Sequence, residues 1–281
     1  TFKAQLFDLY SCPRTLPALR GAVNMRAFSR ALRYVAPVAS EADRATFWHG
    51  ACIVLRDDAW MCGAVSPFRI SVAGSALSKE WTAGEIVALP PKVAVAALPV
   101  LSCGNESDVT VHFDESGPIV LQCGRVEVRC SRAERVPITA SHIATLNSWL
   151  TDAPRVILNE NALHTAIRTL WAVHRAGAPA RLRLCDDGES VMMASYDYDG
   201  SDANHVRTSV PCEKSPDGEL PEIIVNTRYL SHAIDGLGRV AVTWDAQRVR
   251  VESIGDLVSI SAFATMRKKD AECREDQVQD E

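Results

Sequence analysis

The 281-residue sequence has no apolar run approaching the roughly 18 residues that a membrane-spanning helix requires. Its N-terminus lacks the pattern of a signal peptide. The nine cysteines occur singly, and no Cys-x-x-Cys pair is present, which argues against both a disulfide framework and a structural zinc site. We therefore expect a cytoplasmic protein with reduced thiols, no membrane partner, and neither a metal nor another cofactor.

Catalytic motifs are also missing. The sequence contains no GxSxG, no HExxH, no P-loop and no GxGxxG after a predicted strand. The paired carboxylates Asp57–Asp58 and Asp186–Asp187 fall where hairpin turns are expected, and turns favour Asp for its hydrogen bonds to the main chain. The seven histidines form no ligand set with metal-site spacing. We predict that the protein is not an enzyme.

What the sequence does contain is enough apolar material for a folded protein, with 47% hydrophobic and 23% charged residues. Its length allows one or two domains. The net charge of −5 argues against a protein coated in basic charge for wrapping nucleic acid. A local basic surface remains compatible with that balance.

The chain repeats itself. Four blocks recur in the same order at a nearly constant offset: 23–33 with 158–168, 54–58 with 183–187, 85–90 with 222–227, and 109–114 with 240–245. Such self-similarity indicates a duplicated structural unit. We predict two copies of one α+β domain, over residues 1–150 and 151–267, followed by a disordered tail over residues 268–281.

Both copies follow the same pattern of elements. Each opens with a helix, capped by Asn24 in the first copy and by Asn159 in the second. Strands follow, and a second helix begins near Pro91 and Thr227. We expect Pro99 to end or fray the second helix of the first copy. Alternating strands then close each copy, and residues 1–20 are predicted to be a strand or arm outside the repeat.

Basic residues gather on the predicted helices. Arg26, Arg30 and Arg33 share one helical face, and the first helix of the second copy carries basic residues at similar spacing. A solvated helix face would explain one such cluster, but the repeat carries it twice. We predict that seven basic residues make phosphate contacts without base readout: Arg26, Arg30, Arg33, Lys92, Arg168, Arg175 and Arg228.

Several segments resemble the bacterial DNA polymerase III sliding clamp (beta clamp) family. Residues 223–234 resemble the strand and second helix of that family's last domain, and residues 257–267 its C-terminal strand. Residues 60–71 and 85–92 resemble parts of its middle domain. Two departures stand out: the family has three domains per chain, and its Thr-Asp-Gly-His loop is replaced here by residues 65–68.

The resemblance implies a fold and a function. Each domain would place paired helices on one face of antiparallel sheets, and the helices would line a pore around duplex DNA. The family closes a six-domain ring from two chains, so a two-domain chain would need a homotrimer. Such a processivity factor would be nucleoid-associated. Alternatives are a clamp-like recruitment or regulatory module that does not encircle DNA, and an unrelated repeat protein or enzyme.

The resemblance also implies a pocket between the two domains that holds DNA polymerase and clamp loader through linear peptide motifs. The matching positions are Trp48, Val65, Phe68, Arg69, Ile70, Pro137, Ala264 and Met266. An ordinary interdomain core is the other interpretation of these residues.

Overall fold

The computed structural model describes residues 16–41, 51–55, 59–75, 85–114, 117–131, 140–149, 154–174, 176–196, 206–214, 220–255 and 258–266. The first repeat consists of β1 (Leu19–Asn24), α1 (Met25–Glu41), β2 (Ala51–Leu55), β3 (Trp60–Ser66), β4 (Arg69–Gly74), β5 (Glu85–Leu89), α2 (Pro91–Leu101), the short 3-10 helix η2 (Ser102–Gly104), β6 (Asp108–His112), β7 (Ile119–Cys123) and β8 (Val126–Cys130).

A connecting helix, α3 (Ala140–Ser148), precedes the second repeat. That repeat consists of β9 (Arg155–Asn159), α4 (Glu160–Val173), β10 (Pro179–Leu184), β11 (Ser190–Ser195), β12 (Arg207–Lys214), β13 (Ile223–Asn226), α5 (Thr227–Ile234), β14 (Arg239–Trp244), β15 (Arg248–Ser253) and β16 (Val258–Ala264).

The strand order shows the duplication directly. One sheet runs β1-β6-β7-β8, and its counterpart in the second repeat runs β9-β14-β15-β16. The other sheet runs β5-β2-β3-β4 in the first repeat and β13-β10-β11-β12 in the second. The chain is therefore α+β and contains two copies of one unit, as the sequence predicts. Because β1 is the counterpart of β9, the repeat begins at Leu19, earlier than predicted.

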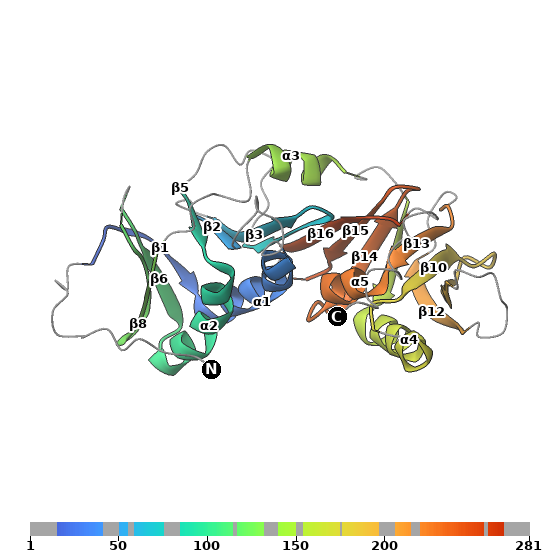
Figure 1. The fold of residues 1–281 in the computed structure, drawn as a ribbon, viewed down its shortest axis with the longest axis horizontal. Helices are drawn as coiled ribbons and strands as arrows, with labels where there is room; N and C mark the ends of the chain where they lie inside the picture. Colours follow the sequence, from blue (N-terminus) through green and yellow to red (C-terminus); the bar gives the residue numbers. More distant parts are fainter. Residues whose placement is uncertain are drawn as a thin grey trace, which may run out of the picture.

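The two repeats join edge to edge. Strand β16 pairs antiparallel with β4, from Val258 opposite Gly74 to Phe263 opposite Arg69. This junction makes one continuous sheet of twelve strands that runs from one repeat into the other (Figure 1). Helices α1 and α5 lie on one side of this sheet, and α3 lies on the opposite side (Figure 1).

Asparagine caps fix the starts of three helices. The side-chain oxygen of Asn24 accepts hydrogen bonds from the main-chain N–H groups of residues 26 and 27, at 3.1 Å each. Asn159 accepts one from residue 162 at 3.2 Å, and Asn226 accepts two at the start of α5. These bonds satisfy amide groups that a helix leaves unpaired at its N-terminus. The two predicted caps, Asn24 and Asn159, are confirmed.

Proline positions match the prediction at one end of α2 only. The helix begins at Pro91, where the missing N–H costs nothing. The prediction for Pro99 is wrong, because the helix continues to Leu101 and then tightens into η2. Ser102 and Cys103 donate side-chain hydrogen bonds to the carbonyl of Pro99, which stabilises this last turn.

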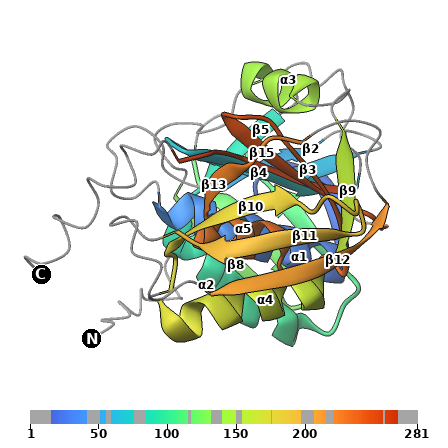
Figure 2. The same cartoon turned by 90° about the vertical axis from the view of Figure 1, so that its right-hand side faces the viewer.

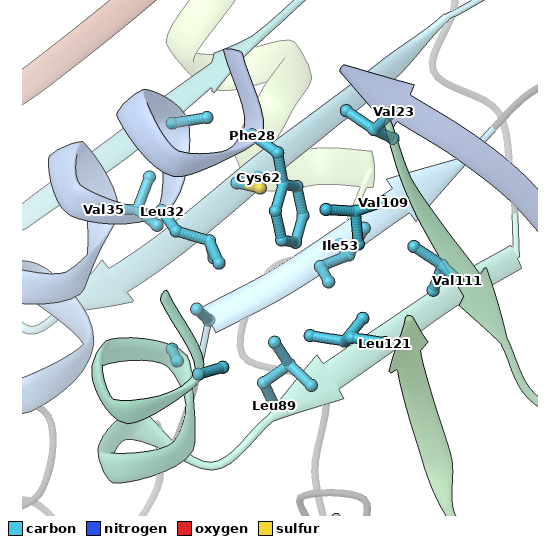
Figure 3. Packing of buried hydrophobic residues seen from close by; sticks show 14 of the residues in the cluster. Val23, Phe28, Leu32, Val35, Ile53, Cys62, Leu89, Val109, Val111 and Leu121 are labelled. Atoms are coloured by element: carbon cyan, nitrogen blue, oxygen red, sulfur yellow. The ribbon is translucent and has the colours of Figure 1, made fainter. Parts of the chain in front are cut away.

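Each repeat has its own core between helices and sheets. In the first, Phe28, Leu32 and Val35 of α1 point into the same cluster as Ile53 and other strand residues (Figure 3). In the second, α4 and α5 pack against β10, β11 and the strands β14 to β16 (Figure 2). A third buried cluster lies on the other face of the junction, under α3. The predicted domain boundary near residue 150 stays a prediction.

Within the described ranges, no helix combines the length and the apolar composition needed to cross a bilayer. The predicted tail over residues 268–281 and the Asp57–Asp58 turn lie outside the described residues. The Asp186–Asp187 turn is described, and it closes with a hydrogen bond from the N–H of Gly188 to the carbonyl of Cys185.

Candidate functional site

The repeat helices share one side of the molecule. Helices α1, α2, α4 and α5 all lie in the lower part of Figure 1, with sheet strands above them and at either end. On α1, Phe28 and Leu32 are buried, while Arg26, Arg30 and Arg33 are exposed. The arginine stripe therefore faces away from the core, on the side that the helices present to solvent.

The three α1 arginines surround a hollow of about 470 Å³. Its other lining residues are the cap Asn24, with Met25, Ser29, Ser102, Glu106 and Ser107. One of these arginines also makes a contact with the second repeat. Arg30 donates a hydrogen bond from Nη2 to the carbonyl of Gly236, 3.1 Å away in the second repeat. Arg26 and Arg33 are thus the better candidates for contact with an external anion.

The second repeat offers two further exposed arginines, Arg168 on α4 and Arg228 at the start of α5. A short hydrogen-bond chain fixes these helices together: Trp171 Nε1 donates to Thr227 Oγ1 at 2.8 Å, and that hydroxyl donates to the carbonyl of Ala178. Arg175 lies outside the described residues. Lys92 is in the first turn of α2, but its side chain is outside the described part.

One group of side chains has the composition of a metal site. Within the described residues, Glu160, His164 and Asp235 bring three possible ligand atoms within 4.8 Å of one another. His164 Nε2 lies 3.7 Å from each carboxylate. The carboxylate of Glu160 already accepts hydrogen bonds from the N–H groups of Gly236 and Gly238. These side-chain and turn contacts account for the group, and the sequence-based prediction missed it despite its i, i+4 spacing.

Side chains from both repeats meet beneath the junction. The hydroxyl of Tyr34 on α1 donates to the carbonyl of Ala233 on α5, 3.0 Å away. Arg69, at the start of β4, is only 4% exposed and places its guanidinium over the ring of Tyr229, 5.0 Å from the ring centroid. Its Nη1 also lies 3.3 Å from Nδ1 of His232. Arg69 therefore connects the first repeat to the second.

On the opposite side of the junction is a pocket of about 350 Å³. Five of the eight predicted pocket residues line it: Val65, Phe68, Arg69, Ile70 and Ala264. Phe68 is 49% exposed at its rim, whereas Val65 and Ile70 also belong to the buried cluster under α3. Val65 and Ile70 therefore both line the pocket and contribute to the packing of the junction.

The remaining predicted pocket residues are not in the lining. Trp48 and Pro137 lie outside the described residues. Met266 is described, but it follows β16 and donates its main-chain N–H to the carbonyl of Ile224, 2.9 Å away. The structure does not bring Met266 into the pocket.

The sequence analysis missed one whole wall of the pocket. Helix α3 contributes four residues, the residue just after it one, and the closing strands two more: Ser141, His142, Thr145, Leu146, Trp149, Arg248 and Ala262. Burial lowers the pKa of His142. The sequence of α3 has only a weak amphipathic pattern, since Leu146 alone among its described side chains is buried. The pattern therefore did not indicate that this helix packs over the pocket.

A buried arginine holds α3 in place. Nη1 of Arg250, on β15, donates to the main-chain carbonyls of Leu146 and Trp149, and Nη2 contacts Glu252. Arg250 is 5% exposed. Arg250 lies on the face of β15 opposite to the core residues Val249 and Val251, and α3 covers that face. A cation near the last carbonyls of a helix is electrostatically favourable.

Solved structures of bacterial clamps share this architecture. The DNA polymerase sliding clamp of Bacillus subtilis superposes with a TM-score of 0.75 at 14% identity, over 92% of this chain and 67% of the clamp chain. The beta subunit of the Streptococcus pyogenes DNA polymerase gives 0.74 at 16% identity, over 92% and 69%. The chain has the sliding-clamp fold. The Pseudomonas aeruginosa DNA polymerase III beta subunit gives 0.73 at 14% identity, again over 92% and 69%.

The chain spans about two thirds of the length of those clamps. No protein-family model matches the sequence, and no curated protein sequence matches it. Most of these comparisons give 12–16% identity, so the similarity establishes the arrangement of helices and strands alone. Arguments about function depend on the residues described above.

Proposed function

We propose that the protein is a DNA sliding clamp: a closed ring of three chains that encircles duplex DNA and tethers polymerases through the pocket under α3. The observation that carries this proposal is the internal β16–β4 junction between two equivalent repeats. A junction of this kind can be repeated between chains, and repetition around an axis generates a closed ring when the rotation closes.

A junction between two chains would use the strands that are equivalent, by the repeat, to β16 and β4. The counterpart of β16 is β8, and the counterpart of β4 is β12. Among the described residues, β8 pairs only with β7 and is the edge of its sheet. Strand β12 meets β9 only at Cys212 and Lys214, so the half from Arg207 to Val210 has an open outer side in the described structure. Open strand edges favour pairing with another strand.

Core residues give the equivalence of β8 and β16 residue by residue. Leu121 of β7 and Val251 of β15 are equivalent, because they pair with Val111 and Val242, which match in the repeated blocks 109–114 and 240–245. On their other side they face Val128 and Ser261. Val128 of β8 is thus equivalent to Ser261 of β16.

Strands β4 and β12 are aligned in the same way. Cys62 of β3 and Met193 of β11 are equivalent, because they pair with Ile53 and Leu182, which match at the offset that relates 54–58 to 183–187. On their other side they face Ala73 and Thr208. Thr208 of β12 is thus equivalent to Ala73 of β4.

One position earlier in β16 and in β4, Ile260 faces Val72 at the internal junction. The equivalent residues between two chains are Glu127 on β8 and Arg207 on β12, which carry opposite charge. Opposite charges directly across a strand pair stabilise it, and like charges oppose it. The register taken from the internal junction therefore places complementary charges at the proposed junction between chains.

Three chains follow from the repeat count. The resembled family closes its ring with six domains, and this chain supplies two. An absolute mass from light scattering is the direct test: we expect three times the 30.6 kDa of one chain. A monomer across micromolar concentrations would contradict the ring and favour the recruitment module that does not encircle DNA.

The exposed arginines suit a sliding contact. Arg26, Arg33, Arg168 and Arg228 lie on helices that share one side of the chain, and a ring would turn that side toward the DNA. Contacts to phosphates are independent of sequence and weaken with salt. Loose contacts of this kind allow the ring to move along the duplex, because topology and not affinity retains it.

The pocket supplies the second half of the function. Its lining includes exposed Phe68 beside buried Val65 and Ile70, an arrangement that accepts apolar side chains from a peptide. We propose that DNA polymerase and clamp loader bind here through linear motifs. The protein would then act without catalysis, as a mobile tether.

A further inference from the structure

The junction between the two repeats has a second layer, in which α1 meets α5. The hydroxyl of Tyr34 on α1 donates to the carbonyl of Ala233, 3.0 Å away. Arg30 donates to the carbonyl of Gly236 at 3.1 Å. Helix α5 ends at Ile234, so both carbonyls lie where a helix leaves such groups unpaired. Side-chain hydrogen bonds therefore stabilise the internal junction in addition to strand pairing.

Helix α2 is the counterpart of α5, and the strands before the two helices give the register. Leu89 pairs with Ala51, and Val225 pairs with Ala180. The two alanines are equivalent by the alignment of β2 with β10 given above, so Leu89 corresponds to Val225. Each helix begins two residues later. This register differs by one residue from the match of the sequence blocks. It brings buried residues of α2 into correspondence with buried residues of α5: Ala94, Ala97 and Leu98 with Leu230, Ala233 and Ile234.

The side of α2 that corresponds to the junction side of α5 is apolar. The residues of α5 and its following turn that contact the first repeat are Tyr229, His232, Ala233 and Gly236. Their counterparts on α2 are Val93, Ala96, Ala97 and Val100. Val93 is partly buried, Ala96 is exposed, and Val100 is 47% exposed. A single exposed valine is ordinary, but these three share one side of the helix at i, i+3 and i+7 spacing.

Helix α4 is the counterpart of α1, and it lacks the polar groups that α1 uses at the internal junction. The two asparagine caps align these helices, so Thr165 corresponds to Arg30 and Thr169 to Tyr34. Both threonines are exposed, and their hydroxyls already donate to main-chain carbonyls of α4 at 2.8 and 2.9 Å. The counterpart of Arg69 lies outside the described residues. Neither threonine therefore replaces the donor that α1 supplies.

We propose that the apolar side of α2, formed by Val93, Ala96 and Val100, is a docking surface for α4 of a second copy of this chain, at Thr165 and Thr169. This inference rests on the proposed function, in which β8 of one chain pairs with β12 of the next. Helices α2 and α4 would meet beside that strand pair as α5 and α1 meet beside β16 and β4. The two junctions then differ in kind, because apolar packing replaces the side-chain hydrogen bonds, and the chains separate more readily than the repeats.

A double-mutant cycle on self-association, measured by sedimentation equilibrium, tests this contact. Because Arg30 reaches Gly236 at the internal junction, Thr165 should face Val100 between chains. Val100→Asp places a carboxylate in an apolar contact, and we expect it to weaken association about tenfold or more. Thr165→Lys alone should also weaken association. The combined variant should restore most of the loss, since the two charges then pair.

Two further variants serve as controls. Ile254→Asp is matched to Val100→Asp, because Ile254 is an apolar residue with 38% exposure that follows β15 and belongs to neither helix. It should leave association unchanged. Tyr34→Phe removes a hydrogen bond of the internal junction, and it should lower the free energy of unfolding without weakening association. Circular dichroism melts establish that each variant is folded.

The outcomes separate this inference from the function beneath it. If the unmodified protein is a monomer across micromolar concentrations, both the ring and the helix contact are wrong. If it forms an oligomer that Val100→Asp does not weaken, or that Thr165→Lys does not restore, the helix contact is wrong while the strand junction stands. An equal loss in Ile254→Asp would show that any added charge opposes association, and it would also overturn the proposal.

Discussion

Arg69 lies over the ring of Tyr229, 5.0 Å from its centroid, and so joins the first strand of the junction to the helix of the other repeat. The same guanidinium faces Nδ1 of His232 at 3.3 Å. Because arginine can only donate, Nδ1 accepts and the neutral ring carries its proton on Nε2. Protonating this histidine would break the contact and place two cations side by side.

The first prediction follows from that histidine. Burial, together with Arg69 and Arg228, lowers the pKa of His232 to about 4. The unfolded chain would bind the proton near pH 6.5. Stability is then complete above about pH 6.5 and falls as the pH decreases toward 4, because only the unfolded state gains protons in that window.

Urea unfolding at pH 7 and pH 5 measures this effect. We expect a lower midpoint at pH 5, and we expect His232→Gln to shrink the difference, since the amide oxygen can still accept from Arg69 without titrating. An equal loss in both proteins would show that other groups cause the pH dependence.

The second prediction concerns the hydrogen bonds that attach α3 to β15. Arg250→Met removes the donors to the carbonyls of Leu146 and Trp149. We expect a loss of about 1.5–3 kcal/mol in the free energy of unfolding, the range for hydrogen bonds to charged groups. Hydrogen exchange should accelerate over residues 140–149. Arg239→Met, an exposed arginine on the adjacent strand, is the control and should leave that exchange unchanged. Unaltered exchange in Arg250→Met would contradict the role given to Arg250.

Arg250 also shows where sequence reasoning ends. Strand alternation correctly places Val249 and Val251 in the core and Arg250 on the other face. Periodicity does not reveal that α3 then covers that face. The duplication and the asparagine caps were predictable because they are local or self-similar. The pocket was predictable only in part, since the wall from α3 depends on packing between distant segments.

The third prediction tests the helical face. Arg26→Glu with Arg33→Glu should leave the fold intact, because both side chains are exposed. It should reduce DNA binding and lower the slope of log K against log salt by about 2, at roughly 0.9 per lost phosphate contact. Arg30 is left unchanged because of its bond to Gly236.

The control for this experiment is Arg183→Glu. Arg183 is exposed on β10, on the face opposite to the core residue Leu182. If Arg183→Glu weakens DNA binding as much, per reversed charge, as the Arg26→Glu/Arg33→Glu variant does, then bulk charge governs binding. The assignment of a DNA-facing side would then be wrong.

The fourth prediction addresses the junction between chains. Glu127→Arg or Arg207→Glu alone should reduce the mass of the oligomer, since each places like charges opposite one another. The combined swap should restore it. Glu127 also pairs with Arg129 on its own strand at 2.9 Å, and Glu127→Arg loses that pair in the single and in the combined variant alike, so the rescue is judged against the single variants. A combined variant no better than its parents would contradict the register taken from β16 and β4.

The fifth prediction separates peptide binding from packing. Phe68→Asp should abolish binding of apolar peptides and leave both fold and oligomer mass unchanged, because Phe68 is 49% exposed. Val173→Asp, at an equally exposed apolar position on α4, is the control. Unfolding of Phe68→Asp would favour the interpretation of these residues as interdomain core.

The central claim is that the protein holds DNA by enclosing it. The direct measurement assembles Glu127→Cys/Arg207→Cys protein on a nicked circular plasmid, oxidises the new pairs to lock the ring, and raises the salt until phosphate contacts are screened. The account predicts that locked protein stays on the circle and is released when the plasmid is cut to a linear duplex. Release from the intact circle, or equal retention on circular and linear DNA, would contradict it.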